Sequence, residues 1–237
     1  MTRPWQTLDR VETAEGLLEL RRRGAADFVI TVGGRVLMNG SAHRSEEAAA
    51  DLACRRVAGR ERPRVLIGGL GMGYTLRAAL DALPAAAAVV VAEINPVVVR
   101  WCRGPLAAAT GRAVDDPRVE IVLDDVAAVI ARAASSDLSG GRFDAIVLDL
   151  YEGPRESTRE AGEPFYGPRA LVRTRAALAP AGVFAVWSEE PDVAFERRLA
   201  AAGFTVERRR PGGGPRHAVY LATGGKMPPS SRSGTIP

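Results

Sequence analysis

The sequence predicts an α/β protein with a doubly wound, Rossmann-like, mostly parallel sheet of seven strands and a small N-terminal β-hairpin region. Two observations lead to this prediction. From residue 64 onward, short apolar runs of strand length alternate with segments of helical pattern, as in a parallel sheet covered by helices on both faces. A glycine-rich turn follows the first of these runs, where doubly wound sheets bind their ligands. With 237 residues, the chain is long enough to bury a sizeable core.

The predicted strands and helices alternate along the second part of the chain. Five apolar runs are expected to form parallel strands, at 65–67, 89–91, 119–123, 145–148 and 183–187. Helices are expected between and after them, at 75–83, 96–102, 126–134, 168–178 and 191–202. Two late strands, at 204–208 and 218–221, would complete the sheet as an antiparallel pair. Right-handed βαβ connections then bring the carboxyl ends of the parallel strands to one edge.

The first sixty residues have a different pattern. Gly33 and Gly34 separate apolar runs at 28–32 and 35–38, which predicts a β-hairpin with a two-residue turn. The run at 17–20 leads into this hairpin, and Ser45 is predicted to cap a helix that continues to residue 57. We therefore expect a small region at 1–60, a nucleotide-binding catalytic domain at 61–223, and a disordered Gly/Pro/Ser-rich tail at 224–237.

The composition limits the chemistry that this chain can perform. It has 32 Lys+Arg against 28 Asp+Glu, but Lys226 is the only lysine, and it lies in the tail, which argues against a Schiff-base or P-loop lysine. The spacings of the two histidines and two cysteines do not fit a zinc site, so no metal is expected. The arginines are scattered among acids, which disfavours a nucleic-acid partner. The sequence lacks an apolar run of roughly 18 residues and a signal-peptide pattern, so a cytoplasmic protein without a membrane partner is expected.

The glycine-rich turn and an acid one strand later form the first candidate site. Gly69, Gly71 and Gly73 follow the first parallel strand, and a helix begins directly after them. Glu93 ends the second strand, where a carboxylate can accept hydrogen bonds from both hydroxyls of a ribose. The G-x-G-x-G spacing without a following lysine favours a nucleoside that carries no phosphates, such as S-adenosylmethionine, over NAD. The alternative is that the glycines serve only helix–strand packing.

Two further strand ends are acidic. Asp124 and Asp125 follow the third parallel strand, and Asp149 follows the fourth. Because the strand tips surround one crevice, Glu93, Asp125 and Asp149 are expected to meet there, with Asp125 able to accept a hydrogen bond from an adenine amino group. Asp124 has the alternative of capping the next helix. Packed carboxylates raise one another's pKa unless a cation lies among them, so the pattern favours a cationic ligand.

These segments resemble the polyamine aminopropyltransferases, the family typified by spermidine synthase. The resemblance extends from Gly16 to about Leu221 and rests on 64–73, 91–95, 116–119 with Asp125, 143–149 and 178–183, together with the N-terminal hairpin and its Glu-containing helix. It implies that Glu93 holds the ribose, Asp125 the adenine and Asp149 the reacting amine. It also implies transfer of an aminopropyl group from decarboxylated S-adenosylmethionine to a small amine, by a protein that forms homodimers.

The sequence departs from this family at two positions. Met72 stands where the family's glycine loop usually carries an aspartate that meets the free amine of the donor. After the fourth strand the family usually has two aspartates three residues apart, whereas here Asp149 is followed by Glu152, which becomes the candidate second acid. Loss of the loop acid leaves open intact S-adenosylmethionine as the donor and methyl transfer as the reaction. A non-catalytic nucleotide-binding homologue is the third alternative.

The remaining candidates are aromatic rings, histidines and cysteines. Tyr151 and Tyr166 follow the fourth strand, where they could line an amine pocket or belong to the core. Trp101 could cover an adenine, although packing against the sheet is favoured, and Trp187 is expected in the core. The other expectations are a surface or capping role for His43, no chemical role for His217, and burial as small apolar residues for Cys54 and Cys102.

Overall fold

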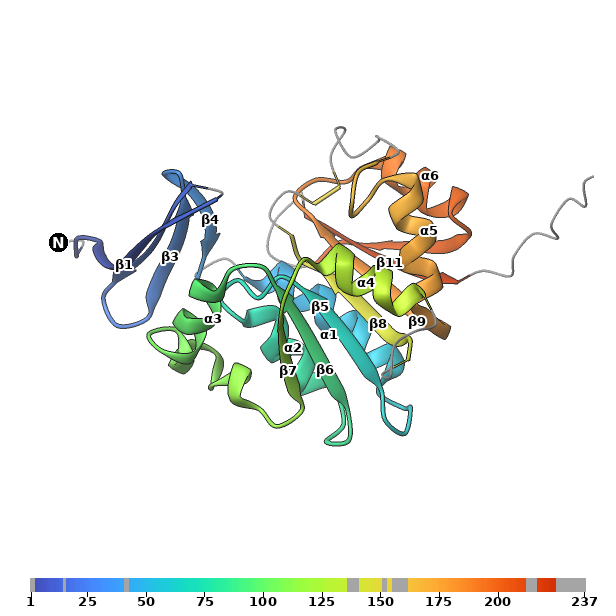
Figure 1. Ribbon diagram of the computed structural model, residues 1–237, viewed down its shortest axis with the longest axis horizontal. Helices are drawn as coiled ribbons and strands as arrows, with labels where there is room; N and C mark the ends of the chain where they lie inside the picture. Colours follow the sequence, from blue (N-terminus) through green and yellow to red (C-terminus); the bar gives the residue numbers. More distant parts are fainter. Residues whose placement is uncertain are drawn as a thin grey trace, which may run out of the picture.

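The computed structural model describes residues 3–14, 16–40, 43–135, 141–150, 153–154, 162–211 and 217–224. They form a four-stranded antiparallel sheet of order β1-β2-β3-β4 and a seven-stranded sheet of order β10-β11-β9-β8-β5-β6-β7. In Figure 1 the small sheet stands beside the larger α/β body. The predicted fold class, a mostly parallel seven-stranded sheet with a small N-terminal β-region, is confirmed.

The small sheet contains one strand more than the sequence predicted. Its strands are β1 (Gln6–Thr13), β2 (Gly16–Arg23), β3 (Asp27–Val32) and β4 (Arg35–Asn39). Gly33 and Gly34 have φ angles of 53° and 79°, as the predicted two-residue turn requires. The sequence pattern does not reveal β1, because this edge strand is largely polar and contains no fully buried residue. Its pairing with β2, rather than burial, makes it a strand.

The large sheet consists of five parallel strands followed at one edge by an antiparallel pair. The parallel strands are β5 (Arg64–Gly68), β6 (Ala88–Glu93), β7 (Val119–Leu123), β8 (Phe143–Leu148) and β9 (Leu178–Ser188). β11 (Ala218–Gly224) lies antiparallel to both β9 and β10 (Phe204–Arg209). All seven strands include the predicted runs, although β9 begins at Leu178, earlier than the expected residue 183.

Within the described ranges, six α-helices cover the two faces of this sheet. They are α1 (Arg44–Val57), α2 (Tyr74–Ala82), α3 (Pro96–Arg103), α4 (Val126–Ala134), α5 (Pro168–Ala177) and α6 (Val193–Ala201). Within β5, Val65 and Ile67 belong to a core with α1, α2 and α3, whereas Leu66 belongs to a core with α4, α5 and α6. This alternation follows from the two-residue period of a strand that is buried on both faces.

Helix starts hold the strand ends at the edge of the sheet. The side chain of Asn95 accepts a hydrogen bond from Val97 N, and Pro96 occupies the first turn, so α3 begins directly after Glu93. The predicted cap of the first helix is wrong. His43 occupies the N-cap position without a side-chain cap hydrogen bond, and Ser45 lies inside α1.

Helix α3 connects the two sheets. Trp101 Nε1 and Arg100 Nη2 both donate hydrogen bonds to Asp9 Oδ2 of β1, each at 2.7 Å. Trp101 is 1% exposed, so the favoured packing role is confirmed. Helix α1 packs against α2 and β9 of the large body. The expected boundary between an N-terminal region and a catalytic domain at residue 60 stays a prediction. Within the described ranges, every helix is too short or too polar to cross a membrane.

Candidate functional site

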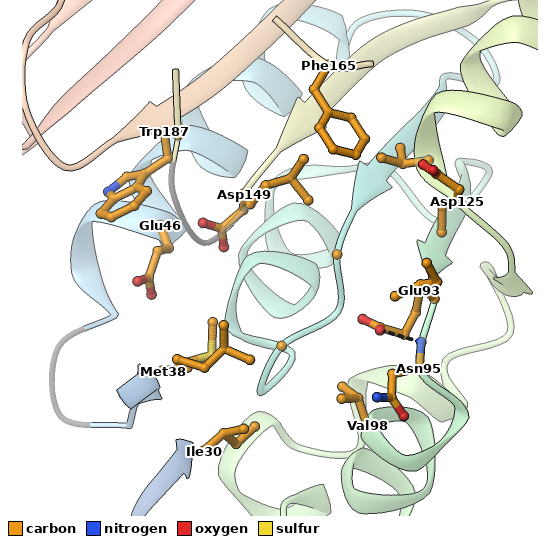
Figure 2. Close-up of a pocket in the computed structure, with 18 of the residues that line it drawn as sticks. Ile30, Met38, Glu46, Glu93, Asn95, Val98, Asp125, Asp149, Phe165 and Trp187 are labelled. Atoms are coloured by element: carbon orange, nitrogen blue, oxygen red, sulfur yellow. Dashed lines mark hydrogen bonds between the residues drawn. The ribbon is translucent and has the colours of Figure 1, made fainter. Parts of the chain in front are cut away.

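A cavity of about 940 Å³ lies at the carboxyl ends of β5, β6, β7 and β8. Doubly wound sheets bind their ligands at this edge, and the volume suits a small molecule. The small sheet closes one side of the cavity with apolar side chains, which are Leu18, Ile30, Val36, Leu37 and Met38. Figure 2 shows Ile30 and Met38 below the glycine loop and Asp149 above it. The cavity is therefore built by both sheets.

The glycine loop forms a tight turn whose amides are largely engaged within the protein. Gly69, Gly71 and Gly73 have φ angles of 84°, 53° and 87°, which favour glycine. Four amides of the loop donate to acceptors of the protein: Gly69 N to Ala92 O, Leu70 N to Glu93 Oε2, Met72 N to Met38 Sδ, and Gly73 N to Leu70 O. A loop that cradles pyrophosphate instead directs its amides at the ligand. Gly69 and Gly71 line the cavity, whereas Gly73, beside Thr110, is not among the described lining residues.

Glu93 is held in place by backbone donors on both sides. Its Oε2 accepts from Leu70 N and its Oε1 from Asn95 N, each at 2.8 Å, and the residue is 7% exposed. Figure 2 shows its carboxylate at the cavity wall beside Asn95. Each carboxylate oxygen has a second lone pair, so the group can accept two further hydrogen bonds from vicinal hydroxyls. The position fits the predicted ribose contact, which remains a proposal.

Asp124 and Asp125 both line the cavity but differ in their partners. Asp125 is the N-cap of α4, because its Oδ1 accepts from Ala127 N at 2.8 Å. The capping role that the sequence left open for Asp124 therefore belongs to its neighbour. Asp124 accepts from Asp125 N and pairs with Arg132 at 2.7 Å, and these contacts lower the pKa of Asp124.

Asp149 lies directly after β8, across the glycine loop from Glu93 (Figure 2). Thr75 Oγ1 donates a 2.6 Å hydrogen bond to its Oδ2, which fixes the carboxylate against the start of α2. Burial raises the pKa of Asp149 to about 6, and the hydrogen bond from Thr75 opposes part of that rise. A carboxyl group with this pKa is ionised at neutral pH and is a stronger base than an exposed aspartate.

The charge of the cavity wall is strongly one-sided. Seven described lining residues carry carboxylates, which are Glu46, Glu93, Asp124, Asp125, Asp149, Glu163 and Glu189. The same set of described residues includes no Lys or Arg. Such a wall favours cationic ligands. No three His, Cys, Asp or Glu side chains in the part of the chain that the structure describes gather in a way that could hold a metal ion.

Several side chains lie in surroundings that the sequence did not predict. Tyr166 is 2% exposed and belongs to the core, yet it also lines the cavity, so both predicted alternatives apply. Trp187 was expected in the core, but it is only partly buried and forms part of the cavity wall, because β9 ends beside the cavity. His217 also lines the cavity, and its Nδ1 lies 3.0 Å from Ser45 Oγ. Tyr151 and Glu152 lie outside the described residues.

Glu46, Glu163 and Glu189 are the acidic lining residues that the sequence did not single out as candidates, and Glu46 lies nearest to the start of α1. Glu46 lies in the first turn of α1, where an acid is commonly explained by its favourable interaction with the positive end of the helix dipole. In the structure its carboxylate faces the cavity near Trp187 and Asp149 (Figure 2). The only sequence signal was the resemblance itself, which included a Glu-containing helix before the glycine loop.

Met72 fills the place of the missing loop acid with an apolar side chain. It is fully buried, and its N–H donates to Met38 Sδ at 3.0 Å. The fold therefore packs this part of the loop against β4 of the small sheet instead of placing a charge there.

The fold is a doubly wound α/β sheet with an acidic cavity at the carboxyl ends of its strands. No family model matches the chain. In sequence it is similar to polyamine aminopropyltransferases. The protein of that name from Mycobacterium tuberculosis is 29% identical over 148 residues, covering 60% of this chain and 27% of that protein. The one from Aeropyrum pernix is 35% identical over 125 residues, covering 51% of this chain and 36% of that protein. The chain thus spans only about a quarter to a third of these curated relatives.

Solved structures show the same architecture. Spermidine synthase from Thermotoga maritima has a TM-score of 0.71 at 19% identity, covering 93% of this chain and 73% of that chain. A spermidine synthase in complex with the transition state analogue AdoDATO has a TM-score of 0.69, at the same identity and coverage. Human methyltransferase-like protein 13 in complex with SAH has a TM-score of 0.59 at 21% identity, covering 77% of this chain and 83% of that chain. The resemblance stated from the sequence is confirmed, and at these identities the structures establish the fold.

Proposed function

We propose that this protein is an alkyl transferase that moves an aminopropyl group from an S-adenosylmethionine-type sulfonium nucleotide to an amine. The observation that carries this proposal is the wall of seven carboxylates without a described Lys or Arg, which includes the partly buried Asp149. Donor and acceptor would both bring positive charge to this wall. The names of the relatives, polyamine aminopropyltransferases and spermidine synthases, support the same reaction.

The nucleoside would occupy the side of the cavity that Glu93 and Asp125 line. Glu93 is oriented by Leu70 N and Asn95 N to receive two ribose hydroxyls, and Asp125 lies nearby at the start of α4 to receive the adenine amino group. The engaged amides of the glycine loop argue against NAD, since its pyrophosphate would need those donors. The complexes of the neighbours, with AdoDATO and with SAH, support a nucleoside ligand without phosphates.

Asp149 would prepare the acceptor. The amine enters as an ammonium ion, Asp149 takes one of its protons, and the freed nitrogen lone pair forms the new bond to carbon. The bound nucleotide supplies an electrophilic carbon whose bond to the sulfonium breaks, with the electron pair going to sulfur. Thr75 keeps one oxygen of Asp149 engaged, which leaves the other oxygen toward the cavity to accept the proton.

Methyl transfer on the same scaffold is the second candidate, and one observation favours it. The buried, apolar Met72 removes the negative charge that would disfavour the carboxylate of intact S-adenosylmethionine. The similarity in fold to a methyltransferase-like protein agrees with this alternative.

The by-product of the reaction distinguishes the candidates. The protein is incubated with decarboxylated or intact S-adenosylmethionine and a panel of amines, and nucleosides are identified by mass spectrometry. Aminopropyl transfer releases 5′-methylthioadenosine, whereas methyl transfer releases S-adenosylhomocysteine. We expect 5′-methylthioadenosine, in amounts that depend on which amine is added. S-adenosylhomocysteine as the sole amine-dependent product would establish methyl transfer, and nucleotide binding without either product would favour a non-catalytic homologue.

Two properties accompany this proposal as predictions. We expect the protein to act in the cytoplasm on a small-molecule amine, and to form a homodimer, as the resemblance implies. Size-exclusion chromatography with light scattering tests the dimer, since a monomeric mass across the working concentration range would contradict it.

A further inference from the structure

The end of the cavity beside Asp149 contains an acid that the proposed reaction has not used. Glu46 extends from the first turn of α1, and its carboxylate lines the cavity (Figure 2). Its Oε2 atom is buried and has no hydrogen-bond partner in the described part of the structure. A buried carboxylate oxygen that receives no hydrogen bond destabilises the folded protein. The presence of such an oxygen at the cavity therefore points to a ligand that donates a hydrogen bond to it.

A second unsatisfied group lies at the same end. Tyr166 is only 2% exposed, and its buried hydroxyl also has no hydrogen-bond partner within the described residues. Its position close to Asp149 follows from its electrostatics, because burial and the charges of Asp149 and Glu163 raise the pKa of Tyr166. An ammonium group has three N–H donors, and the two carboxylates and this hydroxyl offer three acceptor groups on the wall of one cavity.

The titratable groups around Glu46 and Asp149 are mostly acidic. From α1 Glu47 lies beside Glu46 and pairs with His43, and from α2 Tyr74 and Thr75 face the two acids. The remaining groups on the cavity wall at this end are Glu163 before α5, Glu189 after β9, and His217 before β11. None of the described lining residues provides a lysine or arginine to balance the charges.

Two carboxylates in such surroundings retain protons more tightly than exposed ones. Burial, the charge of Asp149 and the charge of Glu47 raise the pKa of Glu46 to about 8. Burial raises the pKa of Asp149 to about 6. At neutral pH the pair therefore holds about one proton, which a cation between the acids would displace by favouring the ionised form of both.

We propose that Glu46 and Asp149 form a proton-linked cation subsite, which holds a proton in the free protein and releases it when the ammonium group of the acceptor binds between them. The exchange balances: the ammonium ion enters with its charge, Glu46 becomes a carboxylate, and one proton leaves to the solvent. Trp187, which stands beside Glu46 in Figure 2, adds an aromatic ring that attracts cations. This inference rests on the proposed function for its amine acceptor, and it makes α1 part of acceptor recognition.

Calorimetry tests the subsite without requiring turnover. The full-length protein is saturated with 5′-methylthioadenosine and titrated with 1,4-diaminobutane at pH 7, in phosphate and in Tris, whose ionisation enthalpies differ. For the wild type we expect release of about one proton per diamine bound. For Glu46→Gln we expect the release to disappear and the affinity to fall about tenfold, as expected for loss of a hydrogen bond to a charged group.

Glu47→Gln is the matched control. It makes the same substitution on the same helix, but Glu47 pairs with His43 and is not among the described residues that line the cavity, so proton release should persist. Glu46→Asp, which keeps a titratable group, should restore part of the release. Thermal unfolding of each variant confirms that it is folded.

The outcomes separate this inference from the proposed function. Diamine binding with proton release that Glu46→Gln abolishes supports the subsite even if no donor gives a transfer product. Diamine binding without proton release, equal release from Glu46→Gln, or no diamine binding at all would overturn the subsite. Transfer activity with wild-type pH dependence in Glu46→Gln would overturn it as well, while leaving the proposed function intact.

Discussion

The carboxylates at the two ends of the cavity differ in the hydrogen-bond donors that they receive. We call the part of the cavity lined by Glu93 and Asp125 the nucleoside end, because we propose that the nucleoside binds there. At this end Glu93 accepts two backbone N–H donors and Asp125 accepts one, so both acids are held by the backbone. At the other end, the described residues give Asp149 one hydroxyl donor, Thr75, and leave one oxygen of Glu46 without a partner. The nucleoside end therefore offers fixed acceptors, while the other end offers acids whose protonation can change.

This difference follows from where the acids lie in the sequence. Glu93 and Asp125 stand where a strand ends and a helix begins, and the chain supplies unpaired amides at such a place. Asp149 and Glu46 come from separate parts of the chain and both face the cavity, and among the described residues Asp149 has the Thr75 hydroxyl as a donor whereas Glu46 Oε2 has none. Fixed acceptors suit recognition of hydroxyl and amino groups, and weakly solvated acids suit proton transfer.

Removing the base at the second end should have the largest effect. We expect Asp149→Asn to lower kcat for group transfer about 10²- to 10⁴-fold, because an amide cannot accept the proton of the amine. Nucleotide affinity should change little, since the fixed acceptors at the other end remain. Steady-state assays and calorimetry with 5′-methylthioadenosine measure the two quantities. A comparable loss in both would show that the two ends do not work separately.

Removing the fixed acceptor at the first end should weaken nucleotide binding instead. We expect Glu93→Gln to cost about 1 to 3 kcal/mol of binding free energy, because a charged acceptor is lost and the new amide opposes a backbone N–H. Calorimetry with 5′-methylthioadenosine measures the loss, and urea unfolding separates it from damage to the fold. Glu120→Gln, the same change at an exposed position on β7, is the control. An affinity equal to that of the wild type would refute the ribose contact.

The sequence predicted the nucleoside end better than the other end, for a physical reason. A glycine turn after one strand and an acid at the end of the next are local signals, and Gly69, Gly71 and Glu93 all lie at the cavity. Glu46 looks like an ordinary helix-start acid, because its proposed role depends on sharing the cavity with Asp149, about a hundred residues away in the chain. Likewise, Trp187 looks like a core residue, because its run is as apolar as any buried strand.

The fold itself was predictable because its strands are continuous apolar runs. The parallel strands β5 to β9 all contain the expected segments, and burial on both faces makes β5, β6 and β8 almost entirely apolar. The polar strand β1 was not predictable, since its register with β2 is set by backbone pairing and by Asp9, which binds Trp101 and Arg100. A single sequence carries no signal for such a contact.

The raised pKa of Glu46 should also appear in the stability of the protein. Glu46 has a pKa of about 8 in the fold against a usual value of 4.5, so the folded state holds a proton that the unfolded state releases. Stability should therefore fall as the pH rises from about 5 to 8, and Glu46→Gln should remove this part of the fall. We expect the variant to gain about 1 kcal/mol over the wild type across this range, less than the full linkage because water screens a partly exposed acid. Urea unfolding at pH 5 and pH 8 measures the difference. Parallel curves for wild type and variant would contradict the raised pKa.

The smallest effect is expected for Asp124, which lines the cavity but is partly exposed to the solvent. Asp124 pairs with Arg132, and both side chains are well exposed, at 37% and 45%. Exposed pairs contribute about 0 to 1 kcal/mol, and the Asp125 N–H that Asp124 accepts can also be accepted by an asparagine oxygen. Asp124→Asn should therefore change nucleotide affinity by less than about threefold, measured by the same calorimetry as Glu93→Gln. A loss as large as that of Glu93→Gln would mean that Asp124 contacts the nucleoside directly, and that the acceptors of this end include Asp124 as well as Glu93 and Asp125.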